Sequence, residues 1–153
     1  MSSTSSFSYV QKQRDKDGFN GSTPFAIAAM SSDHRLRKRI MVVDDEDDVN
    51  VTLRIVLEDQ FSVDVFNDPF VALDNFKPGA YDLLLIDIRM QKMNGLVLCK
   101  KLRKMDSKVR VCFITAGEMV FDFALRTFPG CTVLKKPIDN YDLIKEVTKM
   151  ISA

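Results

Sequence analysis

The chain has 153 residues, of which 46% are apolar and 28% charged, and its formal net charge is +1. This length suits one domain with a single buried core, and the composition excludes collagen-like, disulfide-stapled and wholly disordered proteins. The longest apolar runs have about six residues, well short of the ~18 that a membrane-spanning helix needs. The sequence therefore predicts a soluble globular protein without a membrane span.

Charge and cysteine content exclude further classes of protein. Residues 1–38 carry a formal charge of +3 and the remainder −2, and neither value indicates the concentrated basic face of a nucleic-acid-binding protein. The three cysteines form no Cys-x-x-Cys pair, and the one histidine, His34, lies near the N-terminus, so no zinc site or disulfide framework is expected. We expect a cytoplasmic protein that does not bind nucleic acid directly.

Residues 1–38 are predicted to form a disordered N-terminal extension. They are rich in polar residues and glycine, and they have neither a two-residue nor a 3.6-residue apolar period. They also lack the apolar stretch of ~7–15 residues, preceded by basic residues, that marks a secretory signal. Met30 leads almost directly into the first strand, so two hypotheses stay open: translation begins at Met30, or the extension is genuine.

From Arg39 onward, short apolar runs alternate with amphipathic stretches of ~10–15 residues, which is typical of strands and helices around a parallel sheet. Five strands are predicted, at residues 40–44, 62–66, 81–87, 109–115 and 131–135. The first, third and fourth are nearly continuous apolar runs, as expected of strands that helices cover on both faces.

Helix signals fall between these strands. The first helix has an apolar stripe of Val49, Leu53, Val56 and Leu57. Asp68 and Pro69 supply an N-cap and a proline at the first position of the second helix. The remaining helices are expected at residues 95–105 and 118–128, and from a cap at Asp139 or Asn140 to the C-terminus.

Right-handed crossovers favour an α/β domain over residues 39–153, a doubly wound five-stranded parallel sheet with strand order 2-1-3-4-5 and five helices. Such sheets bind ligands beyond the carboxyl ends of their strands. The polar residues at those ends are Asp44, Asp45, Asp87, Thr115 and Lys136.

These strand-end residues predict a metal-assisted phosphoryl site. Three carboxylates that lie close together raise one another's pKa unless a cation is shared, and hard oxygen ligands suit Mg²⁺. A carboxylate beside Mg²⁺ can attack phosphorus to form an aspartyl phosphate, while a lysine neutralises the transferred group. Simpler explanations also stay open: Asp44 or Asp45 caps the first helix, Asp87 is a solvated strand end, and Thr115 is an ordinary β-branched strand residue.

Five motifs in this order and spacing resemble the receiver domain of two-component response regulators, which has a flavodoxin-like fold. They are Val42-Val43-Asp44-Asp45-Glu46, Leu85-Ile86-Asp87-Ile88-Arg89-Met90, Asn94-Gly95, Ile114-Thr115-Ala116-Gly117 and Lys135-Lys136-Pro137. The resemblance covers residues 39–153.

The resemblance implies that Asp87 accepts a phosphoryl group from a sensor histidine kinase or phosphotransfer protein. Asp44, Asp45, Asp87 and the backbone carbonyl of Arg89 would then hold Mg²⁺. Thr115 and Lys136 would bind the phosphoryl group. It also implies a phosphorelay signalling domain whose only catalysis is its own phosphorylation and dephosphorylation, so that it is not an enzyme in the usual sense.

The chain departs from the family pattern at three positions. Val133 stands where the family has an aromatic residue three positions before the lysine, so the usual threonine–aromatic coupling is not expected. Gln91 replaces a common proline, which predicts a looser turn. Arg89 has a side chain able to pair with a carboxylate or a bound phosphate, and Gly117 leaves room for attacking water.

The chain stops soon after the fifth helix, which predicts a stand-alone receiver whose output depends on binding. Apolar residues of the fourth helix spread over more than half its circumference, wider than a helix packed on one side needs. The surplus, including Phe121 and Phe123, predicts a face for a downstream protein or for homodimerisation. The alternative is a helix covered more deeply by its neighbours.

Three other functions are weighed against this one. A phosphorelay intermediate or phosphate sink would share the chemistry but lack a partner selective for the phosphorylated form. A haloacid-dehalogenase-like phosphatase needs a second Asp two residues after the nucleophile, where this chain has Arg89. A flavin or nucleotide binder is disfavoured because the sequence has no Gly-x-Gly-x-x-Gly or P-loop motif.

Overall fold

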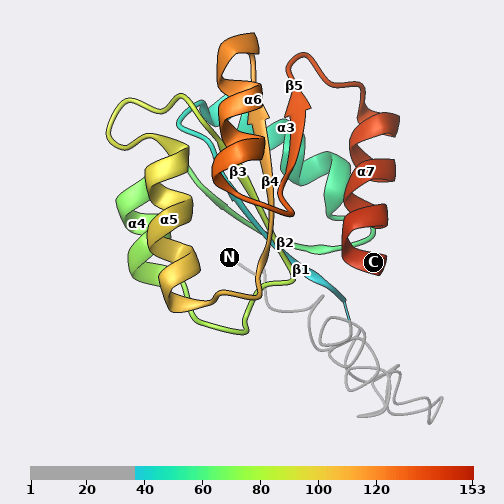
Figure 1. Ribbon diagram of the computed structural model, residues 1–153. Coiled ribbons are helices and arrows are strands. Elements are labelled where there is room, and N and C mark those ends of the chain that lie inside the picture. Colours follow the sequence, from blue (N-terminus) through green and yellow to red (C-terminus); the bar gives the residue numbers. More distant parts are fainter. Residues whose placement is uncertain (1–36) are drawn as a thin grey trace, which may run out of the picture. The chain divides into compact units, whose positions relative to one another are not determined.

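The computed structural model describes residues 37–153 (Figure 1). The predictions for residues 1–36, namely most of the disordered extension, the position of His34 and translation from Met30, lie outside the described residues. Within the described part of the chain, no helix is long and apolar enough to cross a membrane.

Five parallel strands form one sheet with the order β2-β1-β3-β4-β5. This order confirms the predicted 2-1-3-4-5 arrangement. The strands are β1 (Arg39–Val43), β2 (Ser62–Phe66), β3 (Leu83–Asp87), β4 (Arg110–Thr115) and β5 (Thr132–Lys135).

Five helices connect and follow the strands, and they cover both faces of the sheet, with α3 and α7 on one face and α4, α5 and α6 on the other (Figure 1). The helices are α3 (Asp47–Leu57), α4 (Pro69–Asn75), α5 (Gly95–Met105), α6 (Glu118–Thr127) and α7 (Asn140–Ser152). All five agree with the predicted helices to within one or two residues.

The three inner strands bury side chains on both faces. In β1, Ile40 and Val42 belong to the core beneath α3 and α7, whereas Met41 and Val43 belong to the core beneath α4, α5 and α6. Because successive strand residues point to opposite faces, each inner strand needs apolar residues at every position. The residues of edge strand β2 are all only partly buried.

Side-chain caps begin three of the helices. Asp68 accepts a hydrogen bond from the Phe70 N–H at 2.9 Å, and Asn94 and Asp139 cap α5 and α7 in the same way. The N-cap of α3 is Glu46, which makes no side-chain cap bond. The interpretation of Asp44 or Asp45 as a helix cap is therefore wrong, because α3 begins after both residues.

Strand register brings the functional strand ends to one edge of the sheet. Val43 of β1 is aligned with Ile86 of β3, and Thr115 of β4 is aligned with Lys135 of β5. The residues that follow Val43, Ile86 and Lys135 are Asp44, Asp87 and Lys136. The sheet therefore delivers these side chains to the same edge.

Gly95 allows the N-terminus of α5 to lie against the backbone that carries Asp87. A Cβ at Gly95 would overlap the carbonyl oxygen of Asp87 and lie 2.9 Å from its carbonyl carbon. We expect Gly95→Ala to lower the free energy of unfolding by about 1–3 kcal/mol, because backbone must move to relieve the overlap. Denaturant unfolding measures this change.

A second glycine provides the control for this prediction. Gly79 has a φ of 75°, and no neighbouring atom lies within 4 Å of its Cβ position. Gly79→Asn should leave stability nearly unchanged, because asparagine tolerates this backbone conformation. Equal effects of the two substitutions would contradict the role assigned to Gly95.

Candidate functional site

Three carboxylates gather at the carboxyl edge of the sheet. Asp44 follows β1 and is 2% exposed, Asp87 ends β3 and is 7% exposed, and Asp45 is partly buried. One carboxylate oxygen from each of the three lies within 4.8 Å of the others. The structure thus brings together the three aspartates that the sequence predicted as metal ligands.

Lys136 reaches into this cluster from the segment after β5. Its Nζ donates a hydrogen bond to Asp44 Oδ2 at 2.8 Å and lies 3.3 Å from Asp87 Oδ1. Its backbone N–H donates to the Thr115 carbonyl oxygen at 2.8 Å, and its peptide bond to Pro137 is cis. One ammonium group is therefore shared between two buried carboxylates.

Burial and the neighbouring opposite charges shift the pKa values of Asp87 and Lys136 in opposite directions. Burial raises the pKa of Asp87, and although Lys136 lowers it, repulsion from Asp44 and Asp45 keeps this pKa above its ordinary value. Burial lowers the pKa of Lys136, but its contacts with Asp44 and Asp87 raise it overall. The lysine is therefore held in its charged form, while the carboxylates remain mutually repulsive.

The donor set fits a hard divalent cation. Asp44, Asp45 and Asp87 supply three carboxylates against the one positive charge of Lys136, so the cluster keeps an excess of negative charge when all four groups are ionised. Oxygen donors with room for water are the ligands that Mg²⁺ prefers.

Thr115 and Arg89 lie together beside the cluster. Thr115 is 1% exposed, and its hydroxyl oxygen accepts a hydrogen bond from the Gly117 N–H at 3.1 Å, which leaves the hydroxyl hydrogen for another acceptor. A Cβ at Gly117 would lie 3.7 Å from both Thr115 Oγ1 and the guanidinium carbon of Arg89. The Arg89 guanidinium and the Thr115 hydroxyl thus both lie next to position 117.

Two supporting contacts were not predicted from the sequence. The buried Asn50 side chain donates from Nδ2 to the Asp44 carbonyl oxygen at 2.6 Å and so holds the end of β1. Asn50 lies on the buried face of α3 with Leu53 and Leu57. A polar residue at helical spacing from Leu53 and Leu57 was the sequence signal that could have identified it.

The other contact involves Gln91, whose backbone N–H donates to Asp45 Oδ2 at 2.9 Å. A proline at this position would have no N–H to donate. The substitution was predicted to loosen the turn, but in the structure this residue fastens the turn to Asp45.

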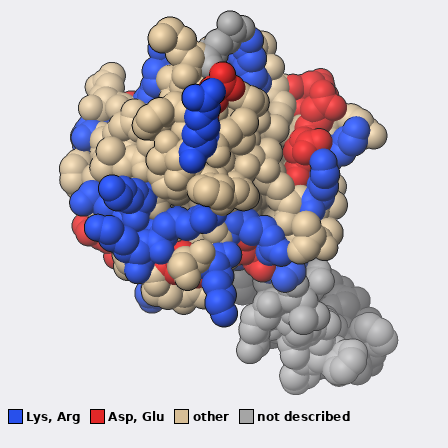
Figure 2. Space-filling view, in the orientation of Figure 1, with Lys and Arg blue, Asp and Glu red and all other residues tan. Residues whose placement is uncertain are grey.

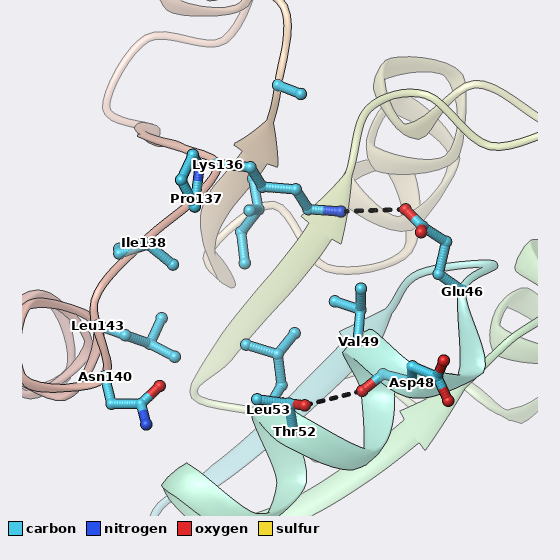
Figure 3. A pocket seen from close by; sticks show the side chains of 12 residues that line it. Glu46, Asp48, Val49, Thr52, Leu53, Lys136, Pro137, Ile138, Asn140 and Leu143 are labelled. Carbon is cyan, nitrogen blue, oxygen red and sulfur yellow. Dashed lines mark hydrogen bonds and ion pairs between the residues drawn. The ribbon is translucent and has the colours of Figure 1, made fainter.

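A cavity of about 490 Å³ adjoins the cluster on the side of α3 and α7. Apolar side chains including Val49, Leu53 and Leu143 line it, and Lys136 and Glu46 face each other across its edge at 3.7 Å (Figure 3). The cavity provides an open approach to Lys136 from outside the sheet.

Comparison with known protein families matches residues 40–148 to the response regulator receiver domain. The chain is 30% identical over 118 residues to the response regulator receiver protein CpdR of Brucella abortus, covering 76% of this chain and 98% of CpdR. It is 33% identical over 85 residues to the transcriptional regulatory protein DltR of Streptococcus agalactiae, covering 55% of this chain but only 38% of DltR.

Solved structures agree with the fold. The BeF3-activated receiver domain of DrrB, from Thermotoga maritima, matches with a TM-score of 0.70 and 16% identity, covering 77% of this chain and all of that domain. A response regulator receiver protein from Sinorhizobium medicae matches with a TM-score of 0.68 and 25% identity, covering 77% of this chain and 97% of that one. The five-stranded fold, the cluster of aspartates with a lysine, and the family match over residues 40–148 place this chain in the response regulator receiver domain family.

Proposed function

We propose that Asp87 is the phosphoacceptor of this receiver domain. The observation that carries the proposal is the position of its carboxylate, 7% exposed at the end of β3 and 3.3 Å from Lys136 Nζ. A carboxylate oxygen of Asp87 would attack phosphorus, and the bond from phosphorus to the donor nitrogen of a phosphohistidine would break with its electron pair leaving on nitrogen. Lys136 would neutralise charge on the transferred group.

The proposed Mg²⁺ ligands are the carboxylates of Asp44, Asp45 and Asp87 and the backbone carbonyl of Arg89. When bound, Mg²⁺ offsets the repulsion between the carboxylates and neutralises phosphoryl oxygens. Burial on two sides and the bonds from Asn50 and Gln91 limit the movement of Asp44 and Asp45. Mg²⁺ would therefore bind without further rearrangement of the strand ends, and this preorganisation supports the proposal.

Thr115 and Arg89 are proposed to contact the phosphoryl group from the β4 side. Thr115 retains a hydroxyl hydrogen to donate, and the Arg89 guanidinium makes no ion pair among the residues that the structure describes. An unpaired guanidinium beside a hydroxyl donor suits a dianionic group. Arg89 also stands where a haloacid-dehalogenase-like phosphatase would need its second Asp, so that alternative has no support here.

The proposed donor is a sensor histidine kinase or a phosphotransfer protein, and the proposed compartment is the cytoplasm. A stand-alone response regulator is the favoured role, with a phosphorelay intermediate or phosphate sink as the alternative. This chain covers 98% of CpdR, a protein named as a response regulator receiver protein, and both roles agree with that name. The alternative would lack a partner that prefers the phosphorylated form.

Output is proposed to occur through α6, by binding a downstream protein or by homodimerisation. Met119 is 93% exposed and Phe123 is 57% exposed, whereas Phe121 is partly buried and packs against the core. The apolar surface of α6 therefore has two parts. Phe121 mainly stabilises the domain, whereas Met119, Phe123 and Leu125 form the accessible part.

Incubation with a small acyl phosphate and Mg²⁺ tests the phosphoacceptor. We expect the intact mass of the wild-type chain to increase by one phosphoryl group, and we expect neither EDTA-treated protein nor Asp87→Asn to gain it. Asp59→Asn, at an exposed turn after α3, is the matched control and should be phosphorylated normally. Uptake by Asp87→Asn at the wild-type level would overturn the assignment.

Asp87→Asn should also change the pH dependence of stability in metal-free buffer. Because the folded-state pKa of Asp87 is raised, ionised Asp87 destabilises the fold at neutral pH, and protonation removes this cost as pH falls through the folded-state pKa. The variant should thus be more stable than wild type at pH ~7, and the difference should close below the ordinary pKa of about 3.9. Urea unfolding in EDTA measures this difference in the free energy of unfolding. A variant less stable than wild type at neutral pH would contradict the electrostatic argument.

Replacing either phenylalanine of α6 by aspartate should change the stability of the domain, but by different amounts. Phe121→Asp should lower the free energy of unfolding by about 1–3 kcal/mol, because it places a carboxylate against the core. Phe123→Asp should change it by less than about 0.5 kcal/mol, because this side chain is exposed. Denaturant midpoints measure both, and a large loss for Phe123→Asp would show that α6 is covered more deeply.

A further inference from the structure

The outward face of α5 carries a stripe of lysines. Lys100, Lys101 and Lys104 are exposed and recur at helical spacing, and Val97 and Met105 stand at the two ends of the same face, 48% and 45% exposed. The opposite face of α5 is buried in the core through residues that include Leu98, Cys99 and Leu102. We call the five exposed residues the α5 basic stripe.

No carboxylate of the described residues lies within ion-pair distance of the stripe. Lys100, Lys101 and Lys104 have no ion pair or side-chain hydrogen bond in residues 37–153, and α5 contains no Asp or Glu. By contrast, Lys92, Lys136 and Lys149 each lie within ion-pair distance of a carboxylate. The stripe is thus an unpartnered cluster of positive charge.

Helix stability does not explain the stripe. A cation in the last turn interacts favourably with the helix dipole, which accounts for Arg103 and Lys104 but not for Lys100 and Lys101. Lys100 and Lys104 are four positions apart, and like charges at this spacing destabilise a helix. The arrangement therefore opposes local stability and suits an external partner.

Other positively charged residues lie on the same side of the molecule as the α5 basic stripe. Lys77 after α4 and Lys108 after α5 are also exposed. Figure 2 shows Lys and Arg side chains gathered towards the lower left, where Figure 1 places α4 and α5. The nearly neutral charge of the whole chain conceals this local excess.

We propose that the α5 basic stripe binds an acidic helical segment of a partner protein. Carboxylates of such a segment would pair with the three lysines, and apolar side chains at its two ends would cover Val97 and Met105, which are about 12 Å apart along the helix axis. The apolar ends favour a protein over a nucleic-acid backbone. A lipid surface is disfavoured because the apolar face of α5 is already buried in the core.

A synthetic peptide tests this surface without requiring phosphorylation. The probe is a fluorescent helical peptide of about 18 residues, with three Glu spaced to meet the lysines and a Leu at each end of the same face. Anisotropy with the full chain measures its affinity. Lys100→Gln/Lys101→Gln/Lys104→Gln should weaken binding roughly tenfold, because three exposed ion pairs are lost.

Matched variants distinguish binding at the stripe from attraction of the peptide by the net charge of the protein. Arg54→Gln/Lys145→Gln/Lys149→Gln removes three positive charges from α3 and α7, on the other face of the sheet, and should weaken binding by less than about twofold. Val97→Ser/Met105→Ser should also weaken binding, while circular dichroism shows that each variant is folded. When the three Glu of the peptide are replaced by Gln, the two triple variants should bind the peptide with equal affinity.

Three outcomes would overturn the proposal. The first is equal loss of peptide affinity in both triple variants, which would show non-specific charge attraction. The second is undetectable peptide binding by the folded wild-type chain. The third is tighter, stripe-dependent binding of duplex DNA or of vesicles containing anionic lipid, which would assign the stripe to a different class of partner.

Discussion

The sharing of one lysine among buried carboxylates is the interaction on which the site depends. Lys136 Nζ lies 2.8 Å from Asp44 and 3.3 Å from Asp87, and both carboxylates are almost fully buried. Ionised carboxylates in such a place are costly unless they are paired, and one ammonium group cannot balance three of them. The same excess of negative charge that destabilises the metal-free site makes it receptive to a divalent cation.

The arrangement of the sheet explains why such a cluster can form at all. Parallel strands in register end at one edge, and helices on both faces bury that edge from two sides. Gly95 then lets α5 start against the Asp87 backbone, and Asn50 ties Asp44 to α3. The apolar strands thus supply the stability that offsets the buried charge.

Much of this could be predicted from the sequence, because strands, caps and strand ends leave local signals. Proline after Asp68 marked α4, and continuous apolar runs marked the inner strands. The contact of Gln91 with Asp45 could not be predicted in the same way, because the two residues are 46 positions apart. Asn50 lies only six positions from Asp44, and its place on the buried face of α3 was a local signal. The α5 basic stripe is not evident from the net charge of long segments, because a helix face collects every third or fourth residue.

The resemblance to the receiver family predicts an aromatic residue where this chain has Val133, so the threonine–aromatic coupling is not expected here. Val133 is buried in the core beneath α4, α5 and α6, and it has no ring that could alternate between an inward and an outward position. Beside the site, the Gly117 N–H donates a hydrogen bond to the Thr115 hydroxyl oxygen. Gly117 is the N-cap of α6 and has no side chain to cap that helix, so this bond ties the start of α6 to the end of β4.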